Sequence, residues 1–316
     1  MPTSTTRSHS AARLRVIAAT ALTALALASC GTGQSAPASS SSTSPTHNVE
    51  HARGTAAVPS APKRVVVLEP VQLDTAVALG VTPVGAAVAS NVKGVPAYLG
   101  EAAAAIESVG TVPEPSLEKI AALHPDLILG TESRHSALYK QLSDIAPTVF
   151  MASQADPWQD NVILVGNALN QEAKAKELLG TYKDRCTSIA SKFKVDGVTA
   201  QLVRPRDESV LSLYGPTSFA GSTLECTGLS IPDRDWEKSI SVDISPERIL
   251  EAKADYVFVT TTDVNDPGTI PAPIRDNAAS FPDVKLVDTS YWVSGVGPLG
   301  GNAVLDDIER ILQDAQ

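Results

Sequence analysis

One stretch of this sequence occurs twice, and the two copies are 129 residues apart. Residues 116–129 read SLEKIAALHPDLIL, and they align without a gap with residues 245–258, which read SPERILEAKADYVF. In each copy a serine suited to cap a helix is followed by a short helical pattern, and then by apolar residues typical of a buried strand. A chain that repeats one helix-to-strand unit is expected to fold into two similar α/β lobes.

The first 29 residues have the pattern of an export signal. Arg7, Arg13 and Arg15 supply positive charge without any acidic residue, and the apolar run that follows at 16–27 is too short to span a bilayer. Residues 27–30, LASC, resemble a bacterial lipobox, in which Cys30 becomes the lipid-modified first residue of the mature chain. The alternative is an ordinary signal peptide with a chance cysteine at its cleavage point. The lipobox predicts a protein anchored by lipid to the extracytoplasmic face of the cell membrane.

Residues 30–62 are rich in serine, threonine, proline, glycine and alanine and contain almost no large apolar side chain. Such a composition cannot bury enough surface to offset the entropy of folding, so it predicts a flexible tether. Removal of the signal takes three of the 25 basic residues and none of the 35 acidic ones, which leaves a formal charge of −13. This acidic balance argues against nucleic-acid binding, and no second apolar stretch is long enough to span a membrane.

The rest of the chain alternates strand-like and helix-like segments. Residues 65–68 form a β-branched run typical of a buried strand, and residues 73–80 form a short helical pattern that ends at a glycine. Such alternation predicts parallel strands joined by crossover helices. We therefore expect an N-terminal α/β lobe at 63–155, with an inserted loop at 91–110. A C-terminal α/β lobe at 195–316 should repeat it and end in a helix at 303–312.

Between the lobes, apolar residues recur at helical spacing from 158 to about 193. Asp156 and Pro157 precede this stretch as an N-cap and a first-turn proline. The pattern predicts one long helix at 156–194, on the order of 50 Å, that joins the two lobes. Cys186 in this helix and Cys226 in the second lobe could form a disulfide, or they could equally be two free buried thiols.

Several familiar sites are excluded. The G-x-G-x-x-G pattern at 295–300 follows a strand, but the chain ends sixteen residues later, which leaves no room for the rest of a dinucleotide-binding unit. No G-x-S-x-G, H-E-x-x-H or P-loop pattern occurs. His124 and His135 lie in the first lobe and the second lobe has no histidine, whereas a metal clamped between lobes usually takes imidazole from both. The sequence therefore predicts no catalytic residue, no metal ligand and no cofactor.

The best candidates for a ligand site follow the strands of the second lobe. Arg204 and Arg206 end the strand at 198–203, and open α/β sheets bind ligands at the carboxyl ends of their strands. Tyr214 opens the next loop, and Trp292 follows the last strand. Loop aromatics near arginines favour a cleft for a large, partly apolar, oxygen-rich ligand. The alternative is a solvated arginine pair with aromatics that only pack locally.

The lipobox, tether, two lobes and connecting helix together resemble the substrate-binding lipoproteins of ABC importers, in the group that binds iron–siderophores and cobalamin. The resemblance covers nearly everything after residue 62. It is carried by RVVVL at 64–68, LGVTPVG at 79–85, residues 115–129, LYGPTSF at 213–219, residues 245–259, YW at 291–292 and LDDIER at 305–310. It implies an α/β fold of two Rossmann-like lobes joined by one long helix, in a monomer that is not an enzyme.

The resemblance also implies a ligand, a ferric siderophore that holds the iron itself and is delivered to the permease of an ABC importer for iron uptake. The residues that would line the pocket are Arg204, Tyr214, Trp292, Arg134, Arg206 and Trp236. Catecholate-binding relatives gather several cations around a strongly anionic complex, whereas only Arg204 is well placed here. We therefore expect a hydroxamate or mixed siderophore.

Glu118 and Glu247 occupy matching places in the repeated stretch. In the family that the chain resembles, such glutamates dock onto arginines of the two permease subunits, one from each lobe. The alternative is that each carboxylate only gains from the helix dipole in the first turn of its helix. Two other functions stay open for the whole chain: a haem or cobalamin carrier of the same fold, and a secreted α/β enzyme without a recognisable motif.

Overall fold

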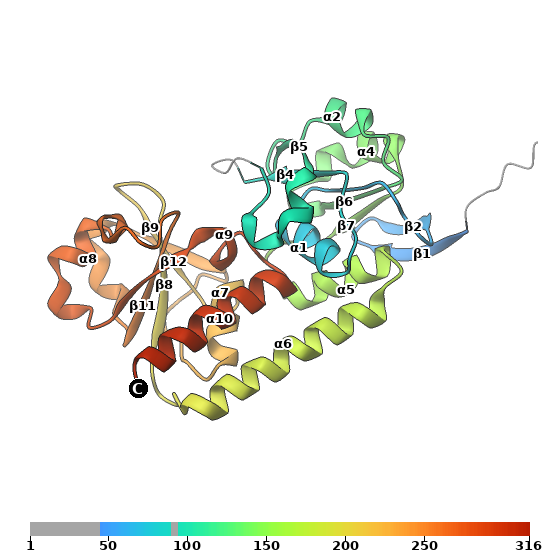
Figure 1. Cartoon of the computed structure of the whole chain (residues 1–316). Helices are drawn as coiled ribbons and strands as arrows, with labels where there is room; N and C mark the ends of the chain where they lie inside the picture. The colour runs from blue at the N-terminus through green and yellow to red at the C-terminus, as the bar shows by residue number, and fades with distance from the viewer. Residues whose placement is uncertain (1–44, 90–93) are drawn as a thin grey trace, which may run out of the picture. The chain divides into compact units, whose positions relative to one another are not determined.

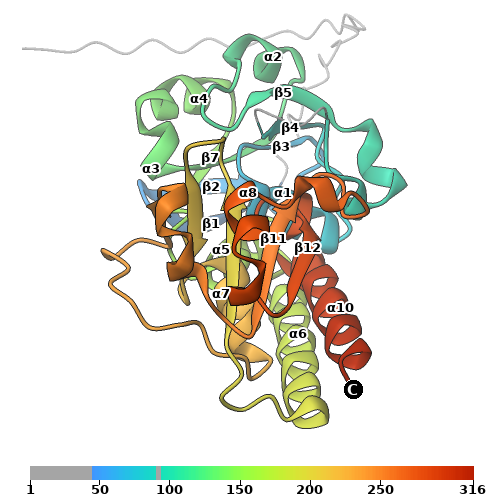
Figure 2. The same cartoon turned by 90° about the vertical axis from the view of Figure 1, so that its left-hand side faces the viewer.

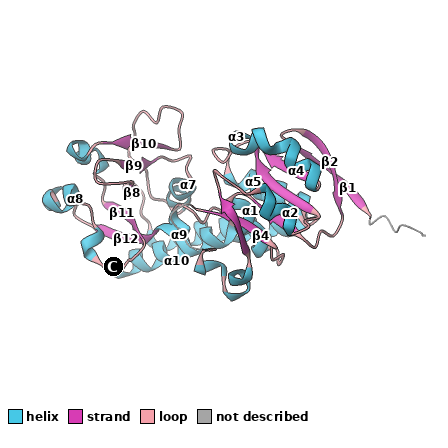
Figure 3. Cartoon of the chain, turned by 90° about the horizontal axis from the view of Figure 1, so that it is seen from above, coloured by secondary structure: helices cyan, strands magenta, loops and turns pink. Residues whose placement is uncertain are grey.

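The computed structural model describes residues 45–89 and 94–316, which form two five-stranded β-sheets surrounded by helices (Figure 1). The strands of the two sheets form separate groups (Figure 3). This arrangement confirms the predicted α/β fold with two lobes. The predicted export signal, Cys30 and the part of the predicted tether before residue 45 lie outside the described residues.

The N-terminal lobe is built on a parallel sheet in the order β5-β4-β3-β6-β7. Its strands are β3 (Val65–Val67), β4 (Gly85–Val88), β5 (Glu107–Thr111), β6 (Leu127–Thr131) and β7 (Thr148–Met151). The connections contain α1 (Pro70–Ala78), α2 (Leu117–Ala122), α3 (Glu132–His135), α4 (Tyr139–Ile145) and the 3₁₀ helices η1 (Ala97–Leu99), η2 (Glu101–Ala105) and η3 (Ser136–Leu138). All residues of β3, β6 and β7 are buried, as expected for a parallel sheet covered on both faces.

The C-terminal lobe has a mixed sheet in the order β10-β9-β8-β11-β12. Its strands are β8 (Ala200–Pro205), β9 (Leu211–Tyr214), β10 (Ser241–Ile244), β11 (Tyr256–Thr261) and β12 (Val284–Asp288). Its helices are α7 (Phe219–Cys226), α8 (Ala272–Asp276), α9 (Thr289–Trp292), α10 (Pro298–Asp314), η4 (Pro246–Ala252), η5 (Pro267–Thr269) and η6 (Ala278–Ser280). The second lobe is not a simple copy of the first, because β9 runs antiparallel to β8 and β10. Residues 206–210 are too few for the crossover that a parallel pair requires.

The repeated stretch has the same structural role in both lobes. The first copy leads into β6, which pairs with β3, and the second leads into β11, which pairs with β8. Asp126, just before β6, accepts hydrogen bonds from the backbone N–H groups of Lys63 (2.7 Å) and Arg64 (2.9 Å). Asp255, just before β11, accepts one from the backbone N–H of Thr199 (2.8 Å). Each copy therefore supplies a carboxylate that fixes the start of the neighbouring parallel strand.

The prediction of a flexible tether up to residue 62 was wrong for its last part. Residues 46–59 form an antiparallel hairpin of β1 (Thr46–His51) and β2 (Gly54–Pro59). Val49 and Val58 are 1% and 0% exposed, and the backbone N–H of Ala52 donates to the carbonyl of Phe150 in β7. Two buried valines on paired strands provide the apolar contact that the average composition of the segment does not reveal.

The predicted single helix at 156–194 is two helices, α5 (Trp158–Ala168) and α6 (Glu172–Phe193). Asn170 adopts a left-handed conformation with φ of 55°. The N–H of Gln171 bonds the carbonyl of Gly166 (2.7 Å), the bonding pattern of a helix C-terminus closed by a left-handed residue. The helical spacing of apolar residues continues across this break because α5 and α6 pack against each other and against the lobes.

A disulfide joins Cys186 of α6 to Cys226 of α7, which decides between the two alternatives left open by the sequence. The bond fastens the connecting helix to the C-terminal lobe. Such a bond is expected in an oxidising compartment.

The C-terminal helix α10 runs alongside α6 and also touches α1 of the N-terminal lobe (Figure 2). The carboxylate of Asp74 in α1 accepts hydrogen bonds from the N–H groups of Leu299 (2.9 Å) and Gly300 (2.8 Å) in its first turn. Gly297 has φ of +145°, and a Cβ at this position would collide with Asp74. The G-x-G-x-x-G pattern therefore allows a close approach to a carboxylate of the same chain.

Candidate ligand cleft

A cavity of about 940 Å³ lies where the strands of both sheets end. The N-terminal lobe lines it with residues that follow β3, β5, β6 and β7, and the C-terminal lobe with residues at or beyond the ends of β8, β9, β11 and β12. Its charged lining residues are Glu69, Arg134, Asp156, Arg204 and Arg206. This is the position at which open α/β sheets bind ligands.

The three predicted arginines all line this cavity. Arg204 and Arg206 come from the end of β8 and the residue after it, and Arg134 comes from α3. The guanidinium of Arg204 donates to the phenolic oxygen of Tyr214 on the neighbouring β9 (3.2 Å). Guanidinium groups from both lobes can bind pairs of ligand oxygens in planar geometry, and among the described lining residues no lysine accompanies them.

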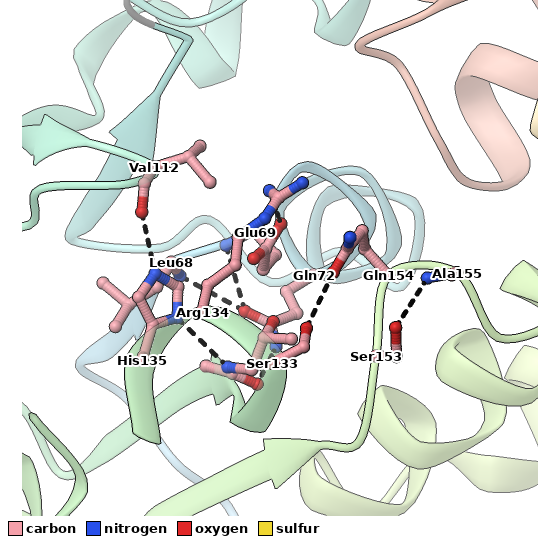
Figure 4. A network of polar contacts seen from close by, with 12 residues as sticks. Leu68, Glu69, Gln72, Val112, Ser133, Arg134, His135, Ser153, Gln154 and Ala155 are labelled. Atoms are coloured by element: carbon pink, nitrogen blue, oxygen red, sulfur yellow. Dashed lines mark hydrogen bonds and ion pairs between the residues drawn. The ribbon is translucent and has the colours of Figure 1, made fainter. Parts of the chain in front are cut away.

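Glu69 is a residue of this wall that the sequence analysis missed. It lies at the N-cap of α1, directly after β3, and its side chain is 1% exposed. Its Oε2 accepts a hydrogen bond from Nη1 of Arg134 at 2.9 Å, and Figure 4 shows the two side chains pointing toward each other. The rule that identified Arg204 applies equally to Glu69, because both follow buried strands of an α/β lobe.

The loop that carries Glu69 is fixed by Gln72 in the first turn of α1 (Figure 4). The side-chain oxygen of Gln72 accepts hydrogen bonds from the N–H groups of Leu68 (3.2 Å) and Glu69 (3.1 Å). Its side-chain nitrogen donates to the carbonyl of Gly130 in β6 at 2.7 Å. Gln72 thereby holds the end of β3 and the end of β6 together under the ion pair.

His135, the residue after Arg134 in α3, is fully buried. Its Nδ1 accepts from the backbone N–H of Thr131 (3.2 Å), so its Nε2 carries the proton and donates to the carbonyl of Val112 (2.7 Å). Burial lowers the pKa of His135, which favours the neutral ring. Both ring nitrogens are therefore engaged in holding α3 in place.

Burial raises the pKa of Glu69 to about 7, although the Arg134 guanidinium and the Thr131 hydroxyl oppose this shift. Neither the Oε1 atom of Glu69 nor the hydroxyl of Thr131 makes a hydrogen bond of good geometry among the described residues, although the Thr131 hydroxyl lies close enough to Glu69 to lower its pKa. The charge of Glu69 therefore depends strongly on Arg134.

The predicted tryptophans take different places. Trp292 borders the cavity, but its side chain is 0% exposed, stacks on Phe258 with ring centroids 4.9 Å apart, and donates through Nε1 to Asp307 (3.0 Å). Trp158 also borders the cavity, at the start of α5. Trp236 is not among the described lining residues; it packs against Gly215 and under Arg234. Trp158 and Trp292 are thus buried side chains beneath the surface of the cavity, and they do not present exposed faces on which a ligand could stack.

The sequence between residues 65 and 273 matches the family described as periplasmic binding proteins. The chain belongs to that family. This periplasmic binding protein is 33% identical over 290 residues to the probable siderophore-binding lipoprotein YfiY of Bacillus subtilis. The match covers 84% of this chain and 88% of the relative. It is 31% identical over 265 residues to the achromobactin-binding periplasmic protein of Dickeya dadantii, with 79% and 86% covered.

Among solved structures, this periplasmic binding protein is similar to SirA of Staphylococcus aureus, complexed with staphyloferrin B. The TM-score is 0.69 at 27% identity, and the match covers 85% of this chain and 99% of SirA. The names of the two sequence relatives describe binding proteins and not enzymes.

Glu118 and Glu247 lie outside the cleft of the periplasmic binding protein, in the first turns of α2 and η4. Both are exposed. The hydroxyl of Ser116 caps α2 by accepting from the N–H of Lys119 (3.3 Å), whereas Ser245 makes no such bond. The backbone N–H of Glu247 itself, and after it the hydroxyl of Ser245, lower the pKa of the Glu247 carboxylate. The helix of the second copy is also a 3₁₀ helix and not an α-helix. The two copies therefore occupy equivalent positions in their lobes but differ in helix type and in capping.

Among residues 45–89 and 94–316, none of the helices is both long and apolar enough to cross a bilayer. Within the same residues, no group of three or more histidine, cysteine, aspartate or glutamate side chains is arranged to hold a metal ion.

Proposed function

We propose that this periplasmic binding protein captures a ferric siderophore outside the cell membrane. The observation that carries the proposal is the cavity of about 940 Å³ at the strand ends of both lobes, with arginines from each lobe in its wall. A space of this size suits a compact organic complex, and guanidinium groups suit its peripheral oxygens. The siderophore and achromobactin named for the two relatives, and the staphyloferrin B bound to SirA, support the same class of ligand.

The charge of the wall favours a hydroxamate or mixed siderophore over a catecholate. Arg134 is already paired with Glu69, and Asp156 adds a second carboxylate. The excess of positive charge is therefore small compared with that needed to balance a strongly anionic complex. Arg204, held by Tyr214, is the cation best placed to meet a ligand oxygen.

Delivery completes the proposed function. The loaded protein would dock on the permease of an ABC importer through Glu118 and Glu247, which lie in exposed first turns, one in each lobe. Cys30, as a lipid-modified residue, would keep the protein at the outer face of the membrane. Iron stays with the siderophore throughout, so no metal ligand from the protein is required.

The test is a titration of ferric siderophores of the hydroxamate, carboxylate, mixed and catecholate classes, with haem and cobalamin alongside, followed by intrinsic tryptophan fluorescence. Trp158 and Trp292 border the cavity and should report its occupation. Saturable quenching by at least one ferric siderophore, and weaker quenching by the iron-free compound, is the expected result. Saturation by haem or cobalamin alone would mean that the protein binds that compound and not a siderophore. Chemical turnover of any compound would point to an enzyme.

A further inference from the structure

The ion pair between Glu69 and Arg134 lies in the wall of the cavity, and its two members are unequally buried. The side chain of Glu69 is 1% exposed and that of Arg134 is 37% exposed. The guanidinium has five N–H donors, yet the bond to Glu69 is its only hydrogen bond within the described residues. Arg134 therefore keeps most of its donors for a ligand, while its charge is already balanced.

No other charged group competes for Glu69 from the elements around it. His135, next to Arg134, is turned to Val112 and Thr131. Asp156, the other carboxylate of the wall, accepts from the backbone N–H of Ser153 at 3.0 Å. Asp74, one turn further along α1, is bound to α10. Among the charged groups of the described residues, Glu69 is thus paired with Arg134 alone.

We infer that Glu69 is a positioning residue that sets, through Arg134, the charge of the ligand that this cavity accepts. The inference rests on the proposed function. While the pair is intact, Arg134 offers hydrogen bonds without net charge, which suits the oxygens of a complex whose core has no net charge, such as a ferric trihydroxamate. A ligand carboxylate that takes Arg134 for itself leaves Glu69 buried without a charged partner, and Glu69 then takes up one proton from solvent.

Two observations support the proton step. An isolated buried carboxylate is strongly disfavoured as an anion, and protonation removes its charge without breaking the fold. Burial raises the pKa of Glu69 to about 7 even with Arg134 beside it, and because Arg134 lowers this pKa, its loss to a ligand would raise the pKa further. Binding of an anionic ferric complex is therefore weakened as the pH rises above neutrality, whereas binding of an uncharged or cationic complex is not.

The experiment compares wild type with Glu69→Gln, which keeps the shape of the side chain and removes its charge. The probes are ferric citrate, which is anionic, and ferrioxamine B, a cationic trihydroxamate complex. Calorimetry at about pH 8 in two buffers of different ionisation enthalpy measures the protons taken up on binding. We expect wild type to take up close to one proton with ferric citrate, E69Q to take up none, and E69Q to bind ferric citrate about tenfold more tightly. Ferrioxamine B should gain nothing from the substitution.

Asp156→Asn is the matched control, because it removes a carboxylate of the same wall that is not paired with Arg134. It should keep the proton uptake. The gain of E69Q should vanish in the background of Arg134→Gln, which a purely structural role would not cause. If E69Q does not fold, the number of protons that wild type takes up on binding ferric citrate tests the inference by itself: close to one supports it, and none overturns it.

Equal proton uptake by wild type and E69Q, or unchanged ferric citrate affinity in folded E69Q, overturns the inference. Absence of ferric citrate binding to both proteins also overturns it. The proposed function fails only if every ferric siderophore of the wider panel fails to bind, so the two failures are distinguishable.

Discussion

The carboxylate of Asp74 accepts a hydrogen bond from the backbone N–H of Gly300 at 2.8 Å, across 226 positions of sequence. Asp74 is 0% exposed, and its two oxygens also accept from the N–H of Leu299 and from the hydroxyl of Tyr98. The N-terminus of a helix attracts negative charge, so this carboxylate acts as the cap of α10 although it belongs to α1. One side chain thereby ties the last helix of the chain to the N-terminal lobe.

Asp74→Ala should destabilise the protein by about 2–4 kcal/mol, because it leaves the N–H groups of Leu299 and Gly300 and the partly buried phenol of Tyr98 without an acceptor. The free energy of unfolding in urea measures the loss. Asp184→Ala, on the exposed side of α6, removes a carboxylate that makes no such contact and should change stability little. A small loss for Asp74→Ala would mean that water replaces the carboxylate.

Gly297→Ala should also destabilise, because the methyl group would collide with Asp74 and because φ of +145° is unfavourable for alanine. Gly180→Ala is the matched control. Gly180 lies within α6 and a Cβ there meets nothing within 4 Å, so this substitution should stabilise by about 0.5–1 kcal/mol. The two melting temperatures should move in opposite directions, and a parallel shift would contradict the role given to the glycine turn.

The buried carboxyl of Glu69 should make stability depend on pH. Its pKa is raised from 4.5 to about 7 in the folded protein, mainly by burial. The folded state therefore binds more protons than the unfolded state, and this contribution to stability is complete below about pH 4.5 and is lost as the pH rises through about 7.

Asp74, whose pKa burial also raises to about 7, acts in the same direction, so the contribution of Glu69 is best taken as a difference from Glu69→Gln. Relative to this variant, wild type should lose on the order of 3 kcal/mol between pH 4.5 and 8. Urea unfolding at several pH values measures the difference. The exposed Glu118→Gln should follow the wild-type curve, and parallel curves for wild type and E69Q would contradict the prediction.

Arg204→Ala should weaken a ferric siderophore by about 1.5–3 kcal/mol, the range for a hydrogen bond to a charged group. Fluorescence titration with the siderophore that binds most tightly to wild type measures the change. Lys183→Ala, which removes an exposed positive charge on α6, should leave the affinity unchanged. Equal affinities for wild type and Arg204→Ala, at equal stability, would show that Arg204 does not meet the ligand.

Glu118→Ala and Glu247→Ala should leave siderophore binding in solution intact and reduce uptake by cells, with the double variant affected most, because both contacts act on one body. Transport of radioactive ferric siderophore measures uptake. Glu177→Ala, an exposed glutamate of α6, is the control. A matching loss of soluble affinity would assign these glutamates to the fold or the cleft.

Two sequence features predicted most of the fold and the cleft: the duplicated stretch, and the tendency of open α/β sheets to bind ligands at the carboxyl ends of their strands. The two lobes followed from the duplicated stretch, and Arg204, Arg206 and Tyr214, expected at the ends of strands, line one cavity. Arg134, which lines the same cavity, was expected only from the resemblance to the family. Their role in binding stays a prediction. Local sequence was sufficient for these features because helix caps, buried strands and strand ends have local signals.

The remainder depends on contacts between distant segments. The break at Asn170 was hidden because apolar spacing continues through it, and the hairpin at 46–59 depends on β7, nearly a hundred residues later. Trp292 was placed near the cleft from its position after a strand, but its indole is committed to Asp307. Glu69 lies near the carboxyl end of a strand as Arg204 does, yet its importance arises only from burial beside Arg134.

The disulfide between Cys186 and Cys226 has a mechanical consequence. It makes α6 part of the C-terminal lobe, while α5 stays packed on β7 and α1 of the N-terminal lobe. The two lobes are therefore fastened at two separate places, residues 169–171 between α5 and α6 and the contact of Asp74 with the start of α10. We expect these two attachments together to limit how far one lobe can move relative to the other.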